Sequence, residues 1–149
     1  MAVDNLYALE SRIIERLREQ VPQFKTVACG SAIGSEISTL IDPAAAFVVP
    51  RAFRVEGDAG KGRSVKIIQP WEIIICVPHV HDLATLEGTA YQAGRYIYPA
   101  ISALAGWKPT NDYAEFRIAP EQSDPEFGIS GRAEFPILFE TYFVLRGLG

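Results

Sequence analysis

The most apolar stretch of the chain is also its richest in β-branched side chains. It runs from Trp71 to Val77 and contains one charged residue, Glu72. β-branched and aromatic side chains pack well on a pleated, buried surface, so the stretch predicts a central strand.

Two long strand-like runs, Ala44 to Val55 and Ser64 to Val77, flank a glycine-rich segment at residues 56–63. This pattern predicts a β-hairpin with a loose tip. A turn centred near Gly60 places Pro50 opposite Pro70, and because proline cannot donate a ladder hydrogen bond, we expect the hairpin to bend there. The expected pairs are residues 44–49 with 71–77 at the base, and 51–55 with 65–69 farther out.

The outer half of this hairpin, about residues 50–70, is predicted to project as an arm. An extended run from Ser64 to Val77 would reach about 46 Å at ~3.3 Å per residue, more than a small domain covers with helix. An apolar face on a projecting element is typical of a partner surface, although the arm could equally fold back over its own core. One face would carry Phe53, Val55, Val65 and Ile67, and the other Arg54, Lys66 and Ile68.

Apolar residues at helical spacing predict two amphipathic helices. The first is expected to be capped by Asp4 or Asn5 and to end before Pro22, and the second to be capped by Asp82 and to end at Gly106 in a left-handed conformation. The apolar positions of the first are Leu6, Leu9, Ile13, Ile14, Leu17 and Val21. Those of the second are Leu83, Leu86, Ala90, Ala93, Ile97, Ile101 and Leu104.

Tyr91 and Tyr98 lie on a flank of the second helix. Covering the edge of the core is the simpler expectation for them, and contact with another subunit is the alternative.

The remaining elements complete an α+β fold. Residues 133–145 alternate with apolar side chains at odd positions and predict a strand with a bulge or edge at Pro136. Lys25 to Cys29 and Glu115 to Ala119 predict short strands, and Pro120 to Gly131 predicts a loop. We therefore expect one domain over residues 1–149: a single mixed, mainly antiparallel sheet packed by two main helices, with a long projecting β-hairpin arm.

Composition narrows the classes of function. The 149 residues carry a net charge of -4, with a pI near 5.2, which disfavours a general nucleic-acid binder. The first 20 residues are charged throughout and no apolar run approaches the ~20 residues of a membrane span, so we expect no signal peptide and a protein made in the cytoplasm.

Candidate chemistry is sparse, and no cofactor or catalytic residue is predicted. Cys29 and Cys76 are expected to be free thiols. The segments Gly30 to Ser35 and Gly60 to Ser64 lack the spacing and the following helix of a phosphate-binding loop. His79 and His81 could share a metal with Asp82, but Asp82 fits the helix cap better, and no Gly-x-Ser-x-Gly elbow is present.

The order of elements resembles the tail terminator proteins of long-tailed bacteriophages, particularly the Mu-type group. The resemblance is carried by four segments that span nearly the whole chain: Ala8 to Leu17, Trp71 to Val77, Gly106-Trp107, and Pro136 to Tyr142. It implies a non-enzymatic ring, hexameric in that family, which caps the completed tail tube, stops its polymerisation and offers the surface to which the head docks. The implied partners are other copies of the chain, the tail-tube protein and a head-tail connector or neck protein, and the implied locations are the host cytoplasm during assembly and then the head-proximal end of the virion tail.

A closed ring needs two different patches on each subunit, and an apolar, basic arm meeting an acidic face would satisfy this requirement. From the hairpin argument we expect the arm to supply Arg51, Phe53, Arg54, Lys61, Arg63 and Lys66. The acidic acceptor would be the loop with Glu121, Asp124 and Glu126.

Two alternatives remain at this point. A neck or head-to-tail joining protein would share the assembly role without capping a tube. A small ligand-binding or metal-dependent enzyme domain would use His79, His81 and Cys76.

Overall fold

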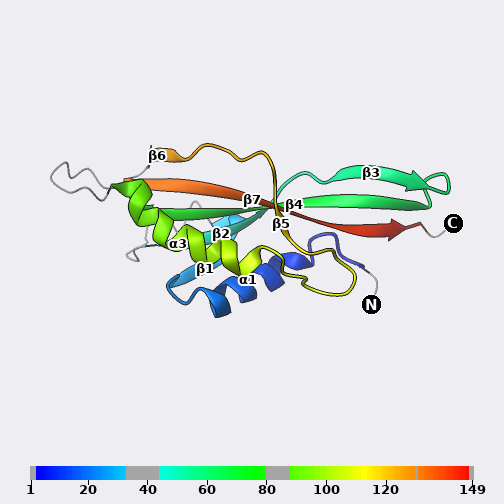
Figure 1. Cartoon of the computed structure of the whole chain (residues 1–149), viewed down its shortest axis with the longest axis horizontal. Helices are drawn as coiled ribbons and strands as arrows, with labels where there is room; N and C mark the ends of the chain where they lie inside the picture. Colours follow the sequence, from blue (N-terminus) through cyan, green and yellow to red (C-terminus); the bar gives the residue numbers. More distant parts are fainter. Residues whose placement is uncertain (1–2, 33–43, 80–87, 130, 148–149) are drawn as a thin grey trace.

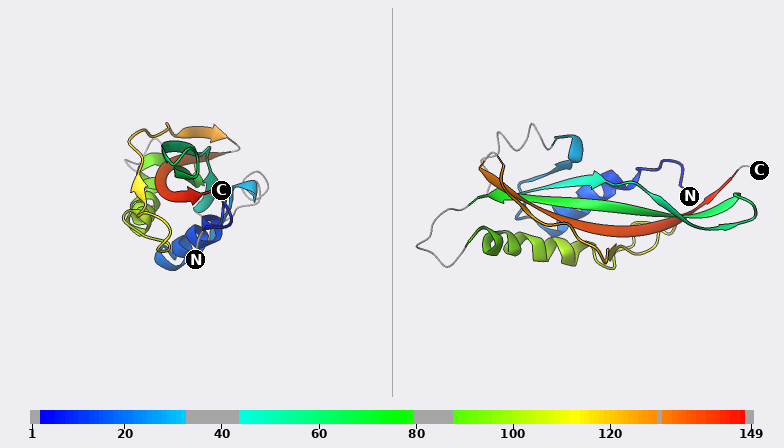
Figure 2. Two further views of the ribbon diagram at one scale, coloured as in Figure 1. Left: turned by 90° about the vertical axis from the view of Figure 1, so that its right-hand side faces the viewer. Right: turned by 90° about the horizontal axis from the view of Figure 1, so that it is seen from above.

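The computed structural model describes residues 3–32, 44–79, 88–129 and 131–147. It consists of one sheet with helices against one face (Figures 1 and 2). The helices are α1 (Leu9–Gln20), the 3-10 helix η1 (Gly30–Ala32) and α3 (Thr89–Leu104). The strands are β1 (Thr26–Cys29), β2 (Ala45–Pro50), β3 (Arg54–Ala59), β4 (Ser64–Pro78), β5 (Arg117–Ile118), β6 (Glu126–Ile129) and β7 (Arg132–Arg146).

The sheet is organised around β4 and β7, which pair antiparallel along their full lengths, from Ser64 opposite Arg146 to Pro78 opposite Arg132. The other edge of β4 is shared by β2 and β3, and the other edge of β7 by β6 and β5. β1 joins β2 in parallel, while every other pair is antiparallel. The predicted α+β class, with a mixed and mainly antiparallel sheet, is confirmed.

The register of the hairpin differs from the sequence prediction. Pro50 lies opposite Trp71 rather than Pro70, and residues 51–53 are in no strand. Farther out, a register shift between Glu56 and Asp58 accompanies a positive φ of 79° at Gly57, as in a β-bulge. The pairs before the bulge, such as Arg54 with Ile68, already centre the hairpin on Lys61 and not on Gly60, and the inserted residue moves the turn half a residue farther.

The outer half is not a two-stranded hairpin, because β7 continues beside β4 to Arg146. The outer end of the sheet therefore has three strands in the order β3, β4, β7. Figures 1 and 2 show these strands continuing past the ends of α1 and α3. A third strand stiffens this end, since a lone hairpin is only marginally stable in water.

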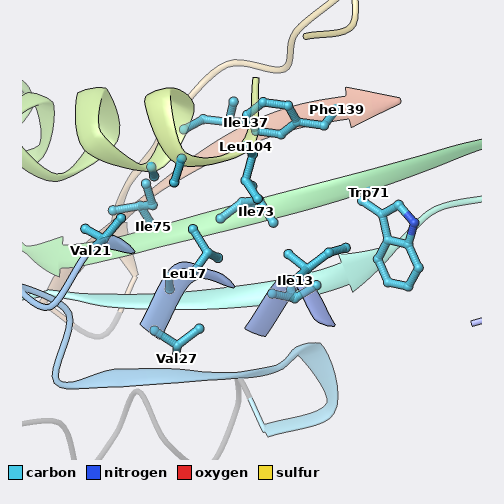
Figure 3. Close-up of a cluster of buried hydrophobic side chains, with 14 of the residues drawn as sticks. Ile13, Leu17, Val21, Val27, Trp71, Ile73, Ile75, Leu104, Ile137 and Phe139 are labelled. Carbon is cyan, nitrogen blue, oxygen red and sulfur yellow. The ribbon is translucent and has the colours of Figure 1, made fainter. Parts of the chain in front are cut away.

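The core lies between the helices and the face of the sheet that carries the odd-numbered residues of β4 and β7 (Figure 3). Leu9, Ile13 and Leu17 of α1 are fully buried there, as their spacing predicts, and each contributes about 1.5–3 kcal/mol by burial. Ile67 and Phe143 belong to the same cluster. On the helix-facing side of the sheet, the outer half is therefore buried near Ile67 and Phe143 and becomes exposed only farther toward the tip.

The helix ends agree with the predictions in part. The N-cap of α1 is Ala8, and the Asn5 side chain instead accepts the backbone N–H of Tyr7 in the preceding turn. Asp82 and the first turn expected for the second helix lie outside the described residues. At the other end of α3, Gly106 has the predicted left-handed φ, 78°. It follows an extended Ala105, and the Trp107 N–H donates to the Leu104 carbonyl, so the helix ends in a type II turn, while the Gly106 N–H donates to the Phe116 carbonyl.

Within α3, the predicted apolar stripe is displaced. Ala90 is exposed, Ile97 and Ile101 are half-buried, and Ala100 and Ala103 are buried instead. Small residues let the helix lie close to its neighbours, so the stripe of large side chains does not alone define the buried face.

One prediction about the C-terminal third is wrong, and the prediction of a bulge or edge at Pro136 is right for the edge, since no described strand flanks β7 there. The expected loop at residues 120–131 contains β6, which pairs with the start of β7. Pro136 causes no bulge, because the β4–β7 register is continuous there. The Leu138 N–H points away from β4 toward the Gln122 side chain, so Pro136, two residues earlier, faces the same side and interrupts no bond to β4.

Candidate assembly surface

Two of the predicted arm residues are bound within their own subunit. The Arg51 guanidinium pairs with Glu72, and that of Arg54 pairs with the buried Glu140 at 2.5 Å. The hydrogen bond to Glu140 raises the pKa of Arg54 above its ordinary value. Arg117 of β5 lies 3.5 Å from the other oxygen of Glu140. These arginines brace the sheet where β2 gives way to β3.

Lys66 is also held within the subunit. Its Nζ lies 3.4 Å from the Glu56 carboxylate and 4.1 Å from the centre of the Tyr142 ring. A cation over an aromatic face and an exposed ion pair each contribute only about 0.5–1 kcal/mol. The three strands of the outer end are thus linked by side chains on this face.

Lys61 and Arg63, at the tip, are the predicted basic residues that are both exposed and without an ion-pair partner among the described residues. Lys61 has a positive φ of 58°, between two glycines that share this conformation. The Gly62 N–H donates to Asp58, and the Gly147 N–H donates to the Arg63 carbonyl. The tip is therefore an ordered turn that presents two positive charges.

The acidic residues gather at the other end of the sheet. Glu121, Asp124 and Glu126 are all exposed. Asp124 and Glu126 line a cleft of about 200 Å³ together with Arg51, Glu72, Ile74, Ser123, Glu134 and Pro136. Burial, followed by the charges of Glu126 and Glu72, raises the pKa of Glu134 above its ordinary value. Of the predicted site residues, the structure brings Arg51 together with the acidic loop inside one subunit.

Apolar side chains are exposed on both edges of the outer end. On the β3 side, Phe53 and Val55 are 45% and 58% exposed. On β7, Tyr142, Val144 and Leu145 are 40%, 46% and 46% exposed. Leu145 was predicted to be core, and the other two were not predicted as site residues. The alternation of side chains along the strand predicts which face of the sheet each residue lies on. That both faces are exposed here follows only from where the helices end, which the sequence pattern does not give.

A second cleft, of about 480 Å³, lies beside the end of β7. It is lined by β7 residues from Tyr142 to Arg146 and by residues 111–115, with Val3 and Lys108. Tyr113 on this wall is buried and packs against Phe143, with ring centroids 5.5 Å apart. The cleft places a partly apolar recess next to the uncovered edge of the sheet.

The expectation that Tyr91 and Tyr98 cover the core is wrong. They are 56% and 76% exposed, and the Arg95 guanidinium lies 5.2 Å from the centre of the Tyr91 ring. Exposed tyrosine and arginine side chains are typical of interfaces.

The residues suggested for an enzyme are engaged elsewhere. His79 Nδ1 lies 3.0 Å from the Thr89 hydroxyl, and its ring packs near Phe127. His81 and Asp82 lie outside the described residues, and within these residues no three potential metal ligands cluster. Burial raises the pKa of Cys76 to about 12, which keeps its thiol protonated and unreactive. In the part of the chain that the structure describes, no helix is long and apolar enough to cross a membrane.

This combination defines a class of structural subunit: a braced sheet whose outer end has exposed apolar side chains on both edges and a basic tip. The sequence profile of the phage tail terminator protein family matches residues 3–147, so the chain belongs to that family. Members are structural proteins of phage tails, which gives this chain a role in tail assembly and a place in the virion tail. The comparison with curated proteins finds no match.

Proposed function

We propose that this protein forms a ring, expected to be a hexamer, which caps the tail tube, ends its polymerisation and provides the surface to which the head docks. The observation that carries the proposal is the match of nearly the whole chain to the tail terminator family. The exposed apolar edges of the outer end support it, because unpaired edges with apolar side chains favour association.

We further propose that the tip contacts the acidic loop of a neighbouring subunit. Lys61 and Arg63 are exposed at one end of the sheet, while Glu121 and Asp124 are exposed at a distance from it. Two opposite charges at different places on each subunit make a head-to-tail contact, which closes into a ring. Arg51, Arg54 and Lys66 are excluded from this role because carboxylates of their own subunit hold them.

The capping activity is tested with purified tail-tube subunits that polymerise in solution. Tubes are grown with and without this protein, and their lengths are measured by electron microscopy. We expect shorter tubes with a ring at one end. Unchanged lengths and bare tube ends would contradict capping, and binding to a connector protein without any effect on tubes would support the neck-protein alternative.

The tip contact is tested with the double variant Lys61→Glu, Arg63→Glu. Its matched control is Arg12→Glu, Lys25→Glu, which makes the same charge change at exposed residues of α1 and the segment after it. We expect the tip variant to lose ring formation and the control to keep it. Ring formation is measured as the mass of the oligomer in solution and as rings seen at tube ends by electron microscopy. Equal behaviour of the two variants would exclude the tip from the contact.

A further inference from the structure

The end of β7 presents backbone groups that no described residue pairs. Even-numbered residues of β7 face away from β4: the Leu138 carbonyl accepts from Ala119, and the Tyr142 carbonyl accepts from Ala114. Among the described residues, the last backbone hydrogen bond on this side is the one to Tyr142; past it, the cleft of about 480 Å³ separates β7 from Val3 and residues 111–115. By alternation, the N–H and C=O groups of Val144 and Arg146 point into this open edge.

β3 forms the opposite open edge of the same three strands. The backbone N–H and C=O groups of Phe143 point toward β4, where Phe143 pairs with Ile67, so those of Ile67 point toward β7. The backbone groups of the next residue, Ile68, then point toward β3. Arg54 pairs with Ile68 and therefore faces β4. Val55, one residue farther along β3, must then direct its own N–H and C=O away from the sheet.

We infer that β3 of one subunit pairs with β7 of its neighbour, and that this joint makes the sheets of the ring continuous. The inference deepens the proposed function and rests on the ring that it assumes. It places the tip of one subunit beside the outer end of its neighbour and away from the neighbour's acidic loop, so it is an alternative to the tip contact, and the tip variant and the cross-links below distinguish the two. The joint is parallel: β3 and β7 are each antiparallel to β4, and rotation about a ring axis along the strands preserves their direction.

The free backbone groups specify one register. In a parallel ladder, one residue bonds to the two residues that flank its opposite number. Val55 placed opposite Leu145 of the neighbour donates its N–H to the Val144 carbonyl and accepts the Arg146 N–H. The register two residues lower would need the Tyr142 carbonyl, which Ala114 already occupies. A one-residue slip would turn the strand over.

The side chains agree with this register. Val55 and Leu145 lie on the same face, and their contact would cover two of the exposed apolar residues of the outer end. The next pair on the other face is Glu56 with Arg146 of the neighbour, which are opposite in charge. Phe53, two residues before Val55 and in no strand, would leave the ladder before the edge that Ala114 occupies and lie toward the 480 Å³ cleft beside β7.

Cysteine cross-linking tests this register. Within one subunit β4 separates β3 from β7, and Val55 and Leu145 pair with different β4 residues, Ile67 and Val65. Residues 55 and 145 therefore lie about 12 Å apart, too far for a disulfide. Any bond between cysteines at these positions must therefore join two subunits. Protein with both Val55→Cys and Leu145→Cys is oxidised mildly, alone and on tail tubes, and examined by non-reducing electrophoresis.

We expect a ladder of covalent oligomers that ends at the size of the ring. Mixing the single variants Val55→Cys and Leu145→Cys should give only mixed dimers, and the wild-type chain, with Cys29 and Cys76, serves as the background control. Dimers of Leu145→Cys alone would show a two-fold β7–β7 joint and overturn the inference, as would the absence of cross-links in assembled rings.

A backbone variant gives an independent test. Val144→Pro removes an N–H at the open edge without removing a bond to β4, and Val144→Thr keeps the N–H and the branched shape. The threonine variant should form the cross-links and cap tubes. If the protein with Val55→Cys and Leu145→Cys forms cross-linked rings and neither it nor wild-type protein shortens tubes, the joint stands and the capping function fails. If tubes are capped without any 55–145 cross-link, the joint is wrong and the function stands.

Discussion

The two halves of the β4–β7 ladder have the same alternation of side chains and differ in what covers them. Around Ile73 and Ile137, helices cover one face and further strands flank both edges. Around Lys66 and Val144, β3 is the single flanking strand among the described elements, and apolar side chains are exposed on both faces. The inner half stabilises the fold, and the outer half leaves apolar side chains exposed on the subunit.

Thiol reactivity should show the largest difference between the halves. The raised pKa of Cys76, about 12 against an ordinary 9.0, leaves on the order of a thousandfold less thiolate at a given pH. A cysteine introduced as Val144→Cys in the outer half should react readily with a thiol reagent at pH 8. Cys76 should react only on unfolding, as followed by mass spectrometry, and comparable rates would refute its burial.

Truncation of one side chain in each half should separate stability from assembly. Phe139 is fully buried against Phe116, so Phe139→Ala should lower the free energy of unfolding by about 3–5 kcal/mol. Val144 in the same strand is 46% exposed, and Val144→Ala should cost less than about 1 kcal/mol in the isolated subunit. Urea denaturation measures both, and equal losses would abolish the distinction.

The boundary between the halves depends on Glu140, which is buried and holds Arg54 and Arg117. Glu140→Gln should cost about 1–3 kcal/mol, since charge-assisted bonds to a buried group are lost. Glu56→Gln, which weakens only an exposed pair with Lys66, should cost less than about 1 kcal/mol. A neutral Glu140→Gln variant in thermal unfolding would show that the pair does not brace the sheet.

The smallest expected effect concerns Glu134 in the acidic cleft. Its pKa is raised in the folded chain, so folding favours its protonated form; that stabilisation is present below about pH 4.5 and is lost as the pH rises through the raised value. Glu134→Gln stays neutral and should gain stability relative to wild type between pH 4 and 7. The free energy of unfolding is measured by urea denaturation across this range. A Glu134→Gln variant that is less stable than wild type would contradict the cause assigned to the pKa shift.

Much of the fold could be predicted from the sequence, because alternation and helical spacing report burial directly. Residues 71–77, the odd positions of β7 as far as Phe143, and Leu9, Ile13 and Leu17 are core as expected. The hairpin register could not be predicted, since it changes between Pro50 and Arg54, where residues 51–53 leave the ladder, and again at the bulge at Gly57, and both depend on backbone conformation. A glycine at that position was the available signal.

The candidate site was harder to predict than the fold. Arg51, Arg54 and Lys66 were predicted to reach a neighbouring subunit, but each is paired with a carboxylate of its own subunit, which lies 21, 86 and 10 residues away in the sequence. Leu145 continues the buried odd positions of β7 and is exposed where the helices end, whereas Val144 continues the even positions, which are half-buried or exposed along most of the strand. Exposure at the end of a long strand depends on the three-dimensional arrangement and not on local composition.

The central claim is that the outer half assembles the ring without stabilising the subunit. It is tested most directly by the lengths of tail tubes grown with Val144→Pro. We predict that this variant unfolds within about 1 kcal/mol of wild type and yet leaves tubes as long as those grown without the protein. A stable Val144→Pro variant that shortens tubes as well as wild type would contradict the account.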